Sequence, residues 1–510
     1  MRVGAFGLVA LLLVISGCDP SNGTDAGVGV DAGMSDAGDV DSGPLDAGPS
    51  LDGGGGMVVP DNYEFDSRFS PGTSGVSHSG QTMRHILIQD LKSYVGGLTA
   101  DIDSGSLDPA ETVVVSNLEY FFSLPGADRA DDPIRLTTDP AADQTTYGAV
   151  SGANLLPKLA GNDTVTDYQD WSTEFAGWSD ASLATNGGGI DSPTNFVRAI
   201  FETLEANAIA RGTGVDRLSP VDSPEQLPVH VTANGVDLQQ LLAKFLLGAL
   251  AFHQAADDYT DGDVDGKGLR SDNTMQDGTD PFSSLEHSWD EAYGYFGASA
   301  DYGSRTAAVT AADPREHDTD SSGGIDLGSE YNFGASMNAA KRDNGATVAT
   351  DYMQTAWTAF RTGRAIITHA DGALDADEMS ALETQRDAAI GAWESAIAAT
   401  VVHYINDTLE IMQDYGTAAF DHARFLTLAK AWSEMKGFAL MFQFNPRSPL
   451  DGSGFGMLHT LLGDAPVLPA AGDPAVDAYR VALRDARDIL GTAYGFDAAN
   501  LGDDVGAGGW

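Results

Sequence analysis

The sequence predicts an all-α protein: two packed helical bundles with a central loop-rich, calcium-loop-containing insertion, behind a disordered N-terminal linker. Three observations support this prediction. Long segments repeat apolar residues at three- and four-residue spacing, the period of a helix with one buried face. Two-residue alternation and hairpin turn signals, which would indicate strands, are scarce. The stretch 256–334 contains two acidic, glycine-bearing loops around one short helix.

Residues 1–17 have the pattern of an export signal. Arg2 is the only charge, 8–15 is a short apolar core, and the segment ends at Cys18 after small residues. The apolar run is too short to cross a bilayer. Its end resembles a bacterial lipobox, whose cysteine is acylated and becomes the first residue, although a cleaved signal with an incidental cysteine remains the alternative. We expect a lipid anchor at Cys18 and a place in the bacterial cell envelope: outer membrane, periplasm or cell surface.

Residues 18–60 are predicted to form a disordered linker. Asp-Ala-Gly triplets begin at Asp25, Asp31, Asp36 and Asp46, and the segment holds no lysine or arginine and few apolar residues. Such a chain cannot bury enough surface to offset its conformational entropy. A flexible segment of this length spans about 35 Å. Regular aspartates also occur in calcium-binding repeats, but the glycines here are too sparse, so we interpret the segment as a spacer.

The composition restricts the partners. The chain has 27 basic and 75 acidic residues, a formal charge of −48. A surface this negative repels phosphate backbones, which excludes nucleic acid as a partner and leaves the lipid anchor as the membrane contact. The same charge suits cations and also keeps an exported protein soluble. Cys18 is the only cysteine, so no intrachain disulfide can form and no other thiol is available for chemistry.

A helical domain is predicted over 61–500, with a first half of about 61–255. Ser79–Val95 has a helical apolar stripe, which Gly96-Gly97 is expected to end. Asp237 is a candidate N-cap and Pro193 stands at a first-turn position. Residues 126–152 have the composition of a loop. The helices predicted in this half are Ser79–Val95, Glu111–Phe122, Asp167–Trp178, Pro193–Ala208 and Asp237–Gln254.

The second half, about 335–500, is predicted to contain longer helices. Apolar residues stay in register from Ile390 to Ile411, and the last helix opens with Asp473-Pro474, a cap followed by a first-turn proline. The helices predicted here are Asp351–His369, Asp377–Tyr415, Asp421–Phe444 and Asp473–Tyr494.

Two loops of the central stretch have the spacing of calcium ligands, with oxygen side chains at alternate positions and then a glycine. In the first loop the glycine is Gly266, and Gly268 replaces the branched residue usual at position 8. In the second loop Ile325 is at position 8, and the last acid, Glu330, lies one residue beyond position 12. The candidate ligands are Asp261, Asp263, Asp265, the Lys267 carbonyl and Asp272, then Asp318, Asp320, Ser322, Asp326 and Glu330. A bound calcium would be structural; an acidic surface turn is the alternative.

The predicted helix 285–297 between the loops carries a candidate transition-metal site. His287, Asp290 and Glu291 share one side at i, i+3 and i+4. They supply half of a ligand set, so neighbours would have to complete it. The alternative is a histidine hydrogen-bonded to a carboxylate at a packed interface. The candidate neighbours are His253, His403 and Glu434, and the expected core residues of this helix are Trp289, Tyr293 and Phe296.

Several segments resemble the domain of unknown function 4856 family of bacterial lipoproteins, from about residue 61 to 450. The matching segments are Tyr63-Glu-Phe65, Ser79-Gly-Gln-Thr82, Lys244–Gln254, Glu286–Gly297, Glu330–Gly334 and Trp432-Ser433-Glu434. More distantly, the chain resembles imelysin-like proteins, two-bundle lipoproteins linked to metallopeptidase activity or iron uptake. Those proteins carry histidine and glutamate three residues apart; here Asp290 is at i+3 and Glu291 at i+4, which departs from that motif.

Three functions remain open at this point. The first is a non-enzymatic, calcium-stabilised binding lipoprotein with an unidentified ligand, serving metal or haem uptake as the imelysin likeness implies. The second is a metal-dependent hydrolase with His287 as ligand and Glu291 as base. The third is a cell-surface interaction module. The sequence favours a binding protein over an enzyme, because no Ser-His-Asp, phosphate-loop or zincin motif stands out.

Overall fold

The computed structural model describes residues 56–110, 112–179, 183, 190–312 and 314–510. In these ranges the protein is helical and contains isolated β-bridges but no strand, which confirms the all-α prediction. The described residues belong to one compact unit. The predicted export signal, Cys18 and the linker up to residue 55 lie outside the described residues, so their predictions stay untested.

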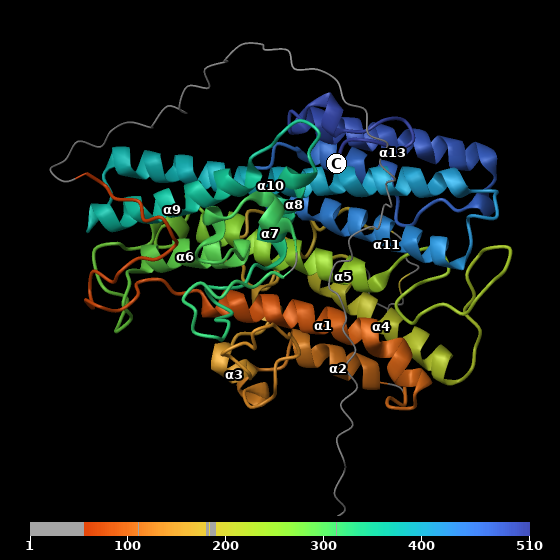
Figure 1. Ribbon diagram of the computed structural model, residues 1–510, viewed down its shortest axis with the longest axis horizontal. Helices are drawn as coiled ribbons and strands as arrows, with labels where there is room; N and C mark the ends of the chain where they lie inside the picture. The colour runs from red at the N-terminus through yellow and green to blue at the C-terminus, as the bar shows by residue number, and fades with distance from the viewer. Residues whose placement is uncertain (1–55, 111, 180–182, 184–189, 313) are drawn as a thin grey trace, which may run out of the picture. The chain divides into compact units, whose positions relative to one another are not determined.

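The first half is organised around helix α1 (Ser79–Asp103), which packs against α2 (Val113–Phe122), α4 (Pro193–Gly212) and α5 (Leu238–Leu246). Figure 1 shows α1 and α2 side by side on one side of the body. The apolar stripe predicted for α1 is buried. Asp237 caps α5 as predicted, because its carboxylate accepts hydrogen bonds from the Gln239 and Gln240 amides.

Helix α1 does not end at Gly96, which corrects the predicted terminator. A methyl group at Gly96 would lie 2.4 Å from the Gln239 side-chain nitrogen, so the glycine permits a close approach between α1 and α5. The Gln239 amide in turn donates a hydrogen bond to the Lys92 carbonyl (2.9 Å). The absence of a side chain at Gly96 therefore allows the two helices to pack closely. A glycine at this position destabilises the helix by only about 1 kcal/mol relative to alanine.

The second half surrounds α10 (Ala376–Ile411), which packs against its neighbours in sequence and space, as Figure 1 shows. With its 3-10 continuation to Asp414, α10 is long and apolar enough to cross a membrane, but 72% of its most apolar window is buried inside the protein. It is the core helix of this half. The helices around it are α8 (Gly334–Gly345), α9 (Tyr352–Ala370), α11 (His422–Ala439) and α13 (Asp473–Ala493). A further helix, α12 (Gly452–Leu462), packs on α13. Neither α8 nor α12 was predicted from the sequence.

The two halves share a core. Helix α5 packs on α11, and α6 (Ser284–Phe296), from the central stretch, contacts both α1 and α9. One cluster of buried apolar side chains includes residues from Tyr63 to Trp510. The predicted bundles therefore fold as one body, and the central stretch lies in their contact rather than on a separate domain.

After α5 the backbone widens into two π-helical turns, η3 (Leu247–Phe252) and η4 (Gln254–Tyr259), joined at His253. A wide turn leaves backbone groups to be satisfied from outside the helix, and the Ala160 amide donates to the Ala249 carbonyl (2.8 Å). The helix predicted over Asp167–Trp178 does not form: these residues make turns that run along the π-helical segment, tied to it by side chains. This tertiary pairing replaces the local helical hydrogen bonds.

Close packing of α6 on α9 provides a test of the fold. A methyl group at Gly363 would lie 2.0 Å from the buried Trp289 ring, whereas one at Gly391 on α10 meets nothing within 4 Å. We expect Gly363→Ala to lower the free energy of unfolding by about 1–3 kcal/mol through overpacking. The matched Gly391→Ala should raise it by about 0.5–1 kcal/mol through helix propensity. Urea denaturation of both variants measures the difference, and equal effects would contradict this packing.

Candidate cation sites

Helix α6 is held by a capping box at its start. The Ser283 hydroxyl accepts a hydrogen bond from the Glu286 amide, and the Glu286 carboxylate accepts one from the Ser283 amide (2.8 Å). Gly297 ends the helix in the left-handed conformation, with φ +76°. Trp289, Tyr293 and Phe296 are buried, which confirms them as core residues.

Asp290 belongs to a buried ion network. Its carboxylate accepts hydrogen bonds from the Tyr63 hydroxyl (2.8 Å) and the Arg364 Nε (3.0 Å). Arg364 also donates to Glu286 (3.0 Å), and Arg68 pairs with the same glutamate (3.2 Å). Burial raises the pKa of Asp290 to about 6, although Arg364 opposes this shift. The network joins the N-terminal segment to α6 and α9.

His287 lies apart from this network. Its ring stacks on Phe282 with 4.5 Å between centroids, and its Nε2 is 3.7 Å from Glu291, which accepts a hydrogen bond from Gln81 (2.7 Å). Among the described residues, no group of three metal-ligating side chains with ligand atoms within 4.8 Å includes His287, Asp290 or Glu291. The expected neighbours have other partners: Glu434 contacts Lys244 (3.3 Å), and His403 contacts Asp407 (3.5 Å). The predicted transition-metal set is not assembled, because Asp290 serves the ion network.

The ion network supports a second prediction. We expect Arg364→Met to destabilise the protein by about 3–5 kcal/mol, because the buried Asp290 loses its guanidinium partner and Glu286 keeps only Arg68. Arg198, which pairs with Glu119 at the surface, provides the control. Arg198→Met should cost less than about 1 kcal/mol. Chemical denaturation compares the two variants, and an Arg364→Met protein as stable as the control would refute the structural role of the network.

The first predicted calcium loop does not bring its carboxylates together. Asp261 accepts hydrogen bonds from two amides of its own turn, those of Asp263 (3.0 Å) and Val264 (2.8 Å). The half-exposed Arg270 side chain pairs with Asp265 (2.7 Å), and the Arg270 amide donates to the Lys267 carbonyl (2.8 Å). Asp272 accepts from the Thr274 amide (2.7 Å).

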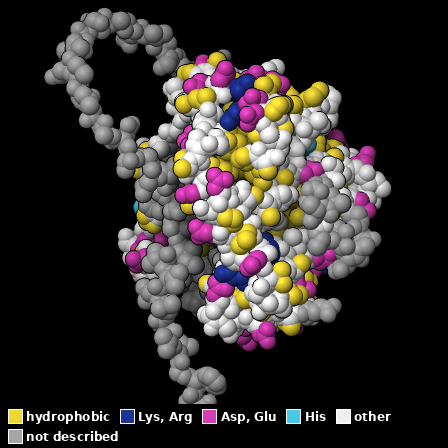
Figure 2. Space-filling model, turned by 90° about the vertical axis from the view of Figure 1, so that its right-hand side faces the viewer, with side chains coloured by type: hydrophobic (Ala, Val, Ile, Leu, Met, Phe, Trp, Pro, Cys, Tyr) yellow, Lys and Arg dark blue, Asp and Glu magenta, His cyan; other side chains and the backbone are white. Residues whose placement is uncertain are grey.

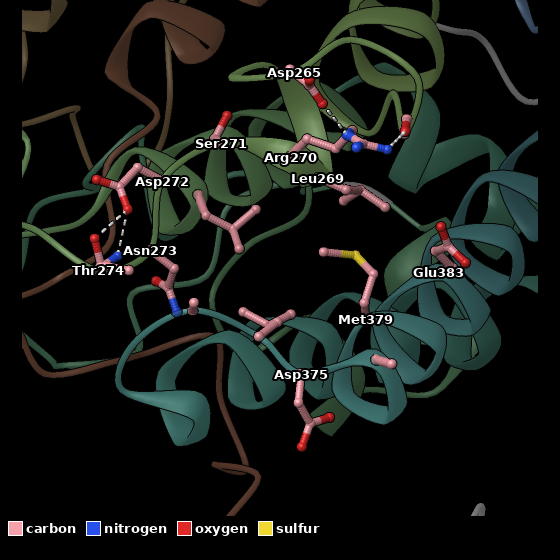
Figure 3. A pocket seen from close by; sticks show the side chains of 15 residues that line it. Asp265, Leu269, Arg270, Ser271, Asp272, Asn273, Thr274, Asp375, Met379 and Glu383 are labelled. Carbon is pink, nitrogen blue, oxygen red and sulfur yellow. Dashed lines mark hydrogen bonds and ion pairs between the residues drawn. The ribbon is translucent and has the colours of Figure 1, made fainter.

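A cavity of about 520 Å³ lies between this loop and the start of α10. In Figure 3 Leu269 and Met379 face each other across it, with Asp375 and Glu383 on the α10 side. The lining combines apolar side chains with polar ones, and four of its residues are acidic against one arginine, Arg270. The lining side chains that define this character are Leu269, Leu285, Leu374 and Met379, and the acids Asp265, Asp272, Asp375 and Glu383.

In the second predicted calcium loop three carboxylates converge. Asp318, Asp320 and Glu330 have ligand oxygens within 4.8 Å of one another. The loop is fastened to the body, because the buried Ile325 exchanges backbone hydrogen bonds with Ala141 and Asp143. Two expected ligands stay outside the group: Asp326 accepts hydrogen bonds from the Gly328 and Ser329 amides and from Gln144, and the Ser322 hydroxyl accepts from Gly324.

A third group was not predicted as a site. Asp167, His253 and Asp257 have ligand atoms within 4.8 Å of one another, and their side chains are 6%, 2% and 2% exposed. His253 Nε2 is 2.9 Å from an Asp167 oxygen, and His253 Nδ1 is 3.8 Å from Asp257. Burial raises the pKa of Asp257 to about 7, opposed by His253. The i, i+4 spacing of His253 and Asp257 was visible in the sequence; the contribution of Asp167 was not.

The described residues form an all-α protein in which acidic side chains are grouped both in the interior and on a loop. Residues 197–423 match the family model described as Domain of unknown function (DUF4856), and this segment belongs to that family. The match confirms the family resemblance and covers α5, α6, both central loops, His253 and Asp257, whereas Asp167 lies before it. Searches of curated proteins and of solved structures returned no match.

Proposed function

We propose that this protein is a lipid-anchored cation-binding protein of the bacterial cell envelope, with a central loop stabilised by calcium. The observation that carries the proposal is the convergence of Asp318, Asp320 and Glu330 on one loop. Three carboxylates this close repel one another, and a divalent cation removes that repulsion. Calcium fits best, because all three groups are oxygen donors and calcium takes six to eight oxygens in flexible geometry.

We infer a structural role for the cation from the way the loop is attached to the rest of the protein. The loop has little core of its own: Ile325 and Leu327 are its buried apolar residues, and Asp318 and Asp320 lie at its surface side. Glu330 is buried at the far end of the loop and accepts a hydrogen bond from the Thr319 amide (2.7 Å). A cation between these ends would close the loop on the body and add its binding energy to folding.

Of the two uptake roles that the sequence left open, metal uptake and haem uptake, we favour the uptake of metal cations. The acidic side chains that line the 520 Å³ cavity would repel haem propionates, whereas they attract positive charge. On the face drawn in Figure 2, acidic side chains are scattered over the surface and basic ones form no continuous patch. Binding is favoured over hydrolysis because His287 and Glu291 have no third ligand grouped with them among the described residues.

Calcium should stabilise the protein through the second loop. At a calcium concentration about 100 times Kd, the gain is about 2.7 kcal/mol, and a chelator should remove it. We expect Asp318→Asn with Asp320→Asn to abolish the calcium-dependent rise in Tm, measured by differential scanning calorimetry.

The matched control is Asp263→Asn with Asp265→Asn, which removes two charges from the first loop. This control should respond to calcium as wild type does. A Tm unmoved by calcium in the wild-type protein would overturn the proposal, and an equal loss in both double variants would assign the effect to net charge instead of to the second loop.

The lipid anchor is tested separately. Cys18→Ser should prevent acylation, so the expressed protein should leave the membrane and detergent phase for the aqueous phase on phase separation. Mass spectrometry of the wild-type N-terminus should show acylated Cys18 as the first residue. Continued detergent partitioning of the variant would rule out this anchor, without bearing on calcium binding.

A further inference from the structure

The group formed by Asp167, His253 and Asp257 combines an imidazole with two carboxylates in the protein interior. Two segments are needed to build it: the π-helical turns supply His253 and Asp257, and the turn after residue 160 supplies Asp167. Hydrogen bonds from the residues on either side of Asp167 join the two segments. The Thr166 hydroxyl donates to Asp258 (3.1 Å), and the Tyr168 amide donates to Asp257 (3.0 Å).

The polar atoms of this group are close together but unsatisfied. His253 Nε2 and the Asp167 oxygen are 2.9 Å apart, yet that oxygen has no aligned hydrogen-bond donor, and His253 Nδ1 has no partner either. Both side-chain amide atoms of the fully buried Gln254 also lack partners. Buried polar atoms without partners are unfavourable, so the unpartnered atoms of Asp167 and His253 within one group indicate a missing binding partner.

The charge of the group is also unbalanced. In the part of the chain that the structure describes, no lysine or arginine forms an ion pair with Asp167 or Asp257. Lys158 pairs with Asp163 and Asp258, and the Arg447 guanidinium donates to the Ala256 carbonyl and approaches Asp387 (3.8 Å). Two buried carboxylates beside a single imidazole leave an excess of negative charge, which a divalent cation would offset.

We propose that Asp167, His253 and Asp257 bind one divalent first-row transition metal ion in the interior of the protein. The donor set selects the class of metal: imidazole nitrogen with carboxylate oxygens suits zinc, iron(II) or manganese, whereas calcium prefers oxygens alone. π-Helical turns inside longer helices occur frequently at functional sites.

The bound metal ties the segment around residues 160–171 to the helix that begins at α5. Trp171 packs edge-on against the His253 ring (5.8 Å between centroids), and Phe444 covers the same ring at 6.0 Å. These aromatic side chains keep water from the imidazole, which strengthens a metal bond in this position. The site is separate from the calcium loop and uses none of its residues.

Zinc and cobalt(II) are the probes. The full chain, stripped with chelator and kept in saturating calcium, should bind one equivalent of either metal by calorimetry, and cobalt should give a visible ligand-field spectrum. His253→Gln and Asp257→Asn should each weaken zinc binding by about 100-fold or more, because each removes a direct ligand. His287→Gln provides the matched control, since it changes a histidine that also has a carboxylate four residues on.

The outcomes separate the alternatives. Loss of zinc binding in the His253 and Asp257 variants, with wild-type affinity in His287→Gln, supports the site. Wild-type affinity in His253→Gln, or no bound zinc or cobalt in the wild-type protein, overturns it. If a helix variant fails to fold, Asp167→Asn on the turn, together with circular dichroism, gives the same comparison. The calcium response of Tm is unaffected by any of these results, so the two proposals fail independently.

Discussion

A buried arginine holds together parts of the chain that are far apart in sequence. Arg364 on α9 is 1% exposed and pairs with both Asp290 and Glu286 of α6, while its Nη2 donates to the Gly75 carbonyl. Burying three charges is favourable only when each is paired and hydrogen-bonded. That requirement fixes the N-terminal segment, α6 and α9 in one arrangement, and the central loops project from this framework.

The framework accounts for the contacts made by the His287, Asp290 and Glu291 motif of α6. Two acidic residues of α6 have partners on other elements. Asp290 belongs to the ion network, and Glu291 accepts a hydrogen bond from Gln81 of α1. His287 is left stacked on Phe282. A motif of histidine and acids on one helix therefore resembles a half-site in sequence, although its partners in space are an arginine, a tyrosine and a glutamine.

The acidic groups of the protein differ in what surrounds them. In the first central loop Arg270 pairs with Asp265, in the second loop three carboxylates converge, and beside η4 two carboxylates meet the His253 imidazole with no lysine or arginine paired to them among the described residues. In the first loop one carboxylate has a cationic side chain as its partner. In the other two groups acidic side chains lie close together and repel one another, which is the ground on which both were proposed as cation sites.

The sequence by itself determined the helical class, the positions of most long helices, the Asp237 cap and the spacing of the second acidic loop, because periodicity and capping depend on neighbours along the chain. It could not determine that Gly96 permits packing instead of ending α1, that residues 167–178 form turns, or that Arg270 pairs with Asp265 in the first loop. Nor could the sequence predict that Asp167 lies beside His253. These features depend on contacts between distant segments, and the energy of such contacts exists only once the helices have packed.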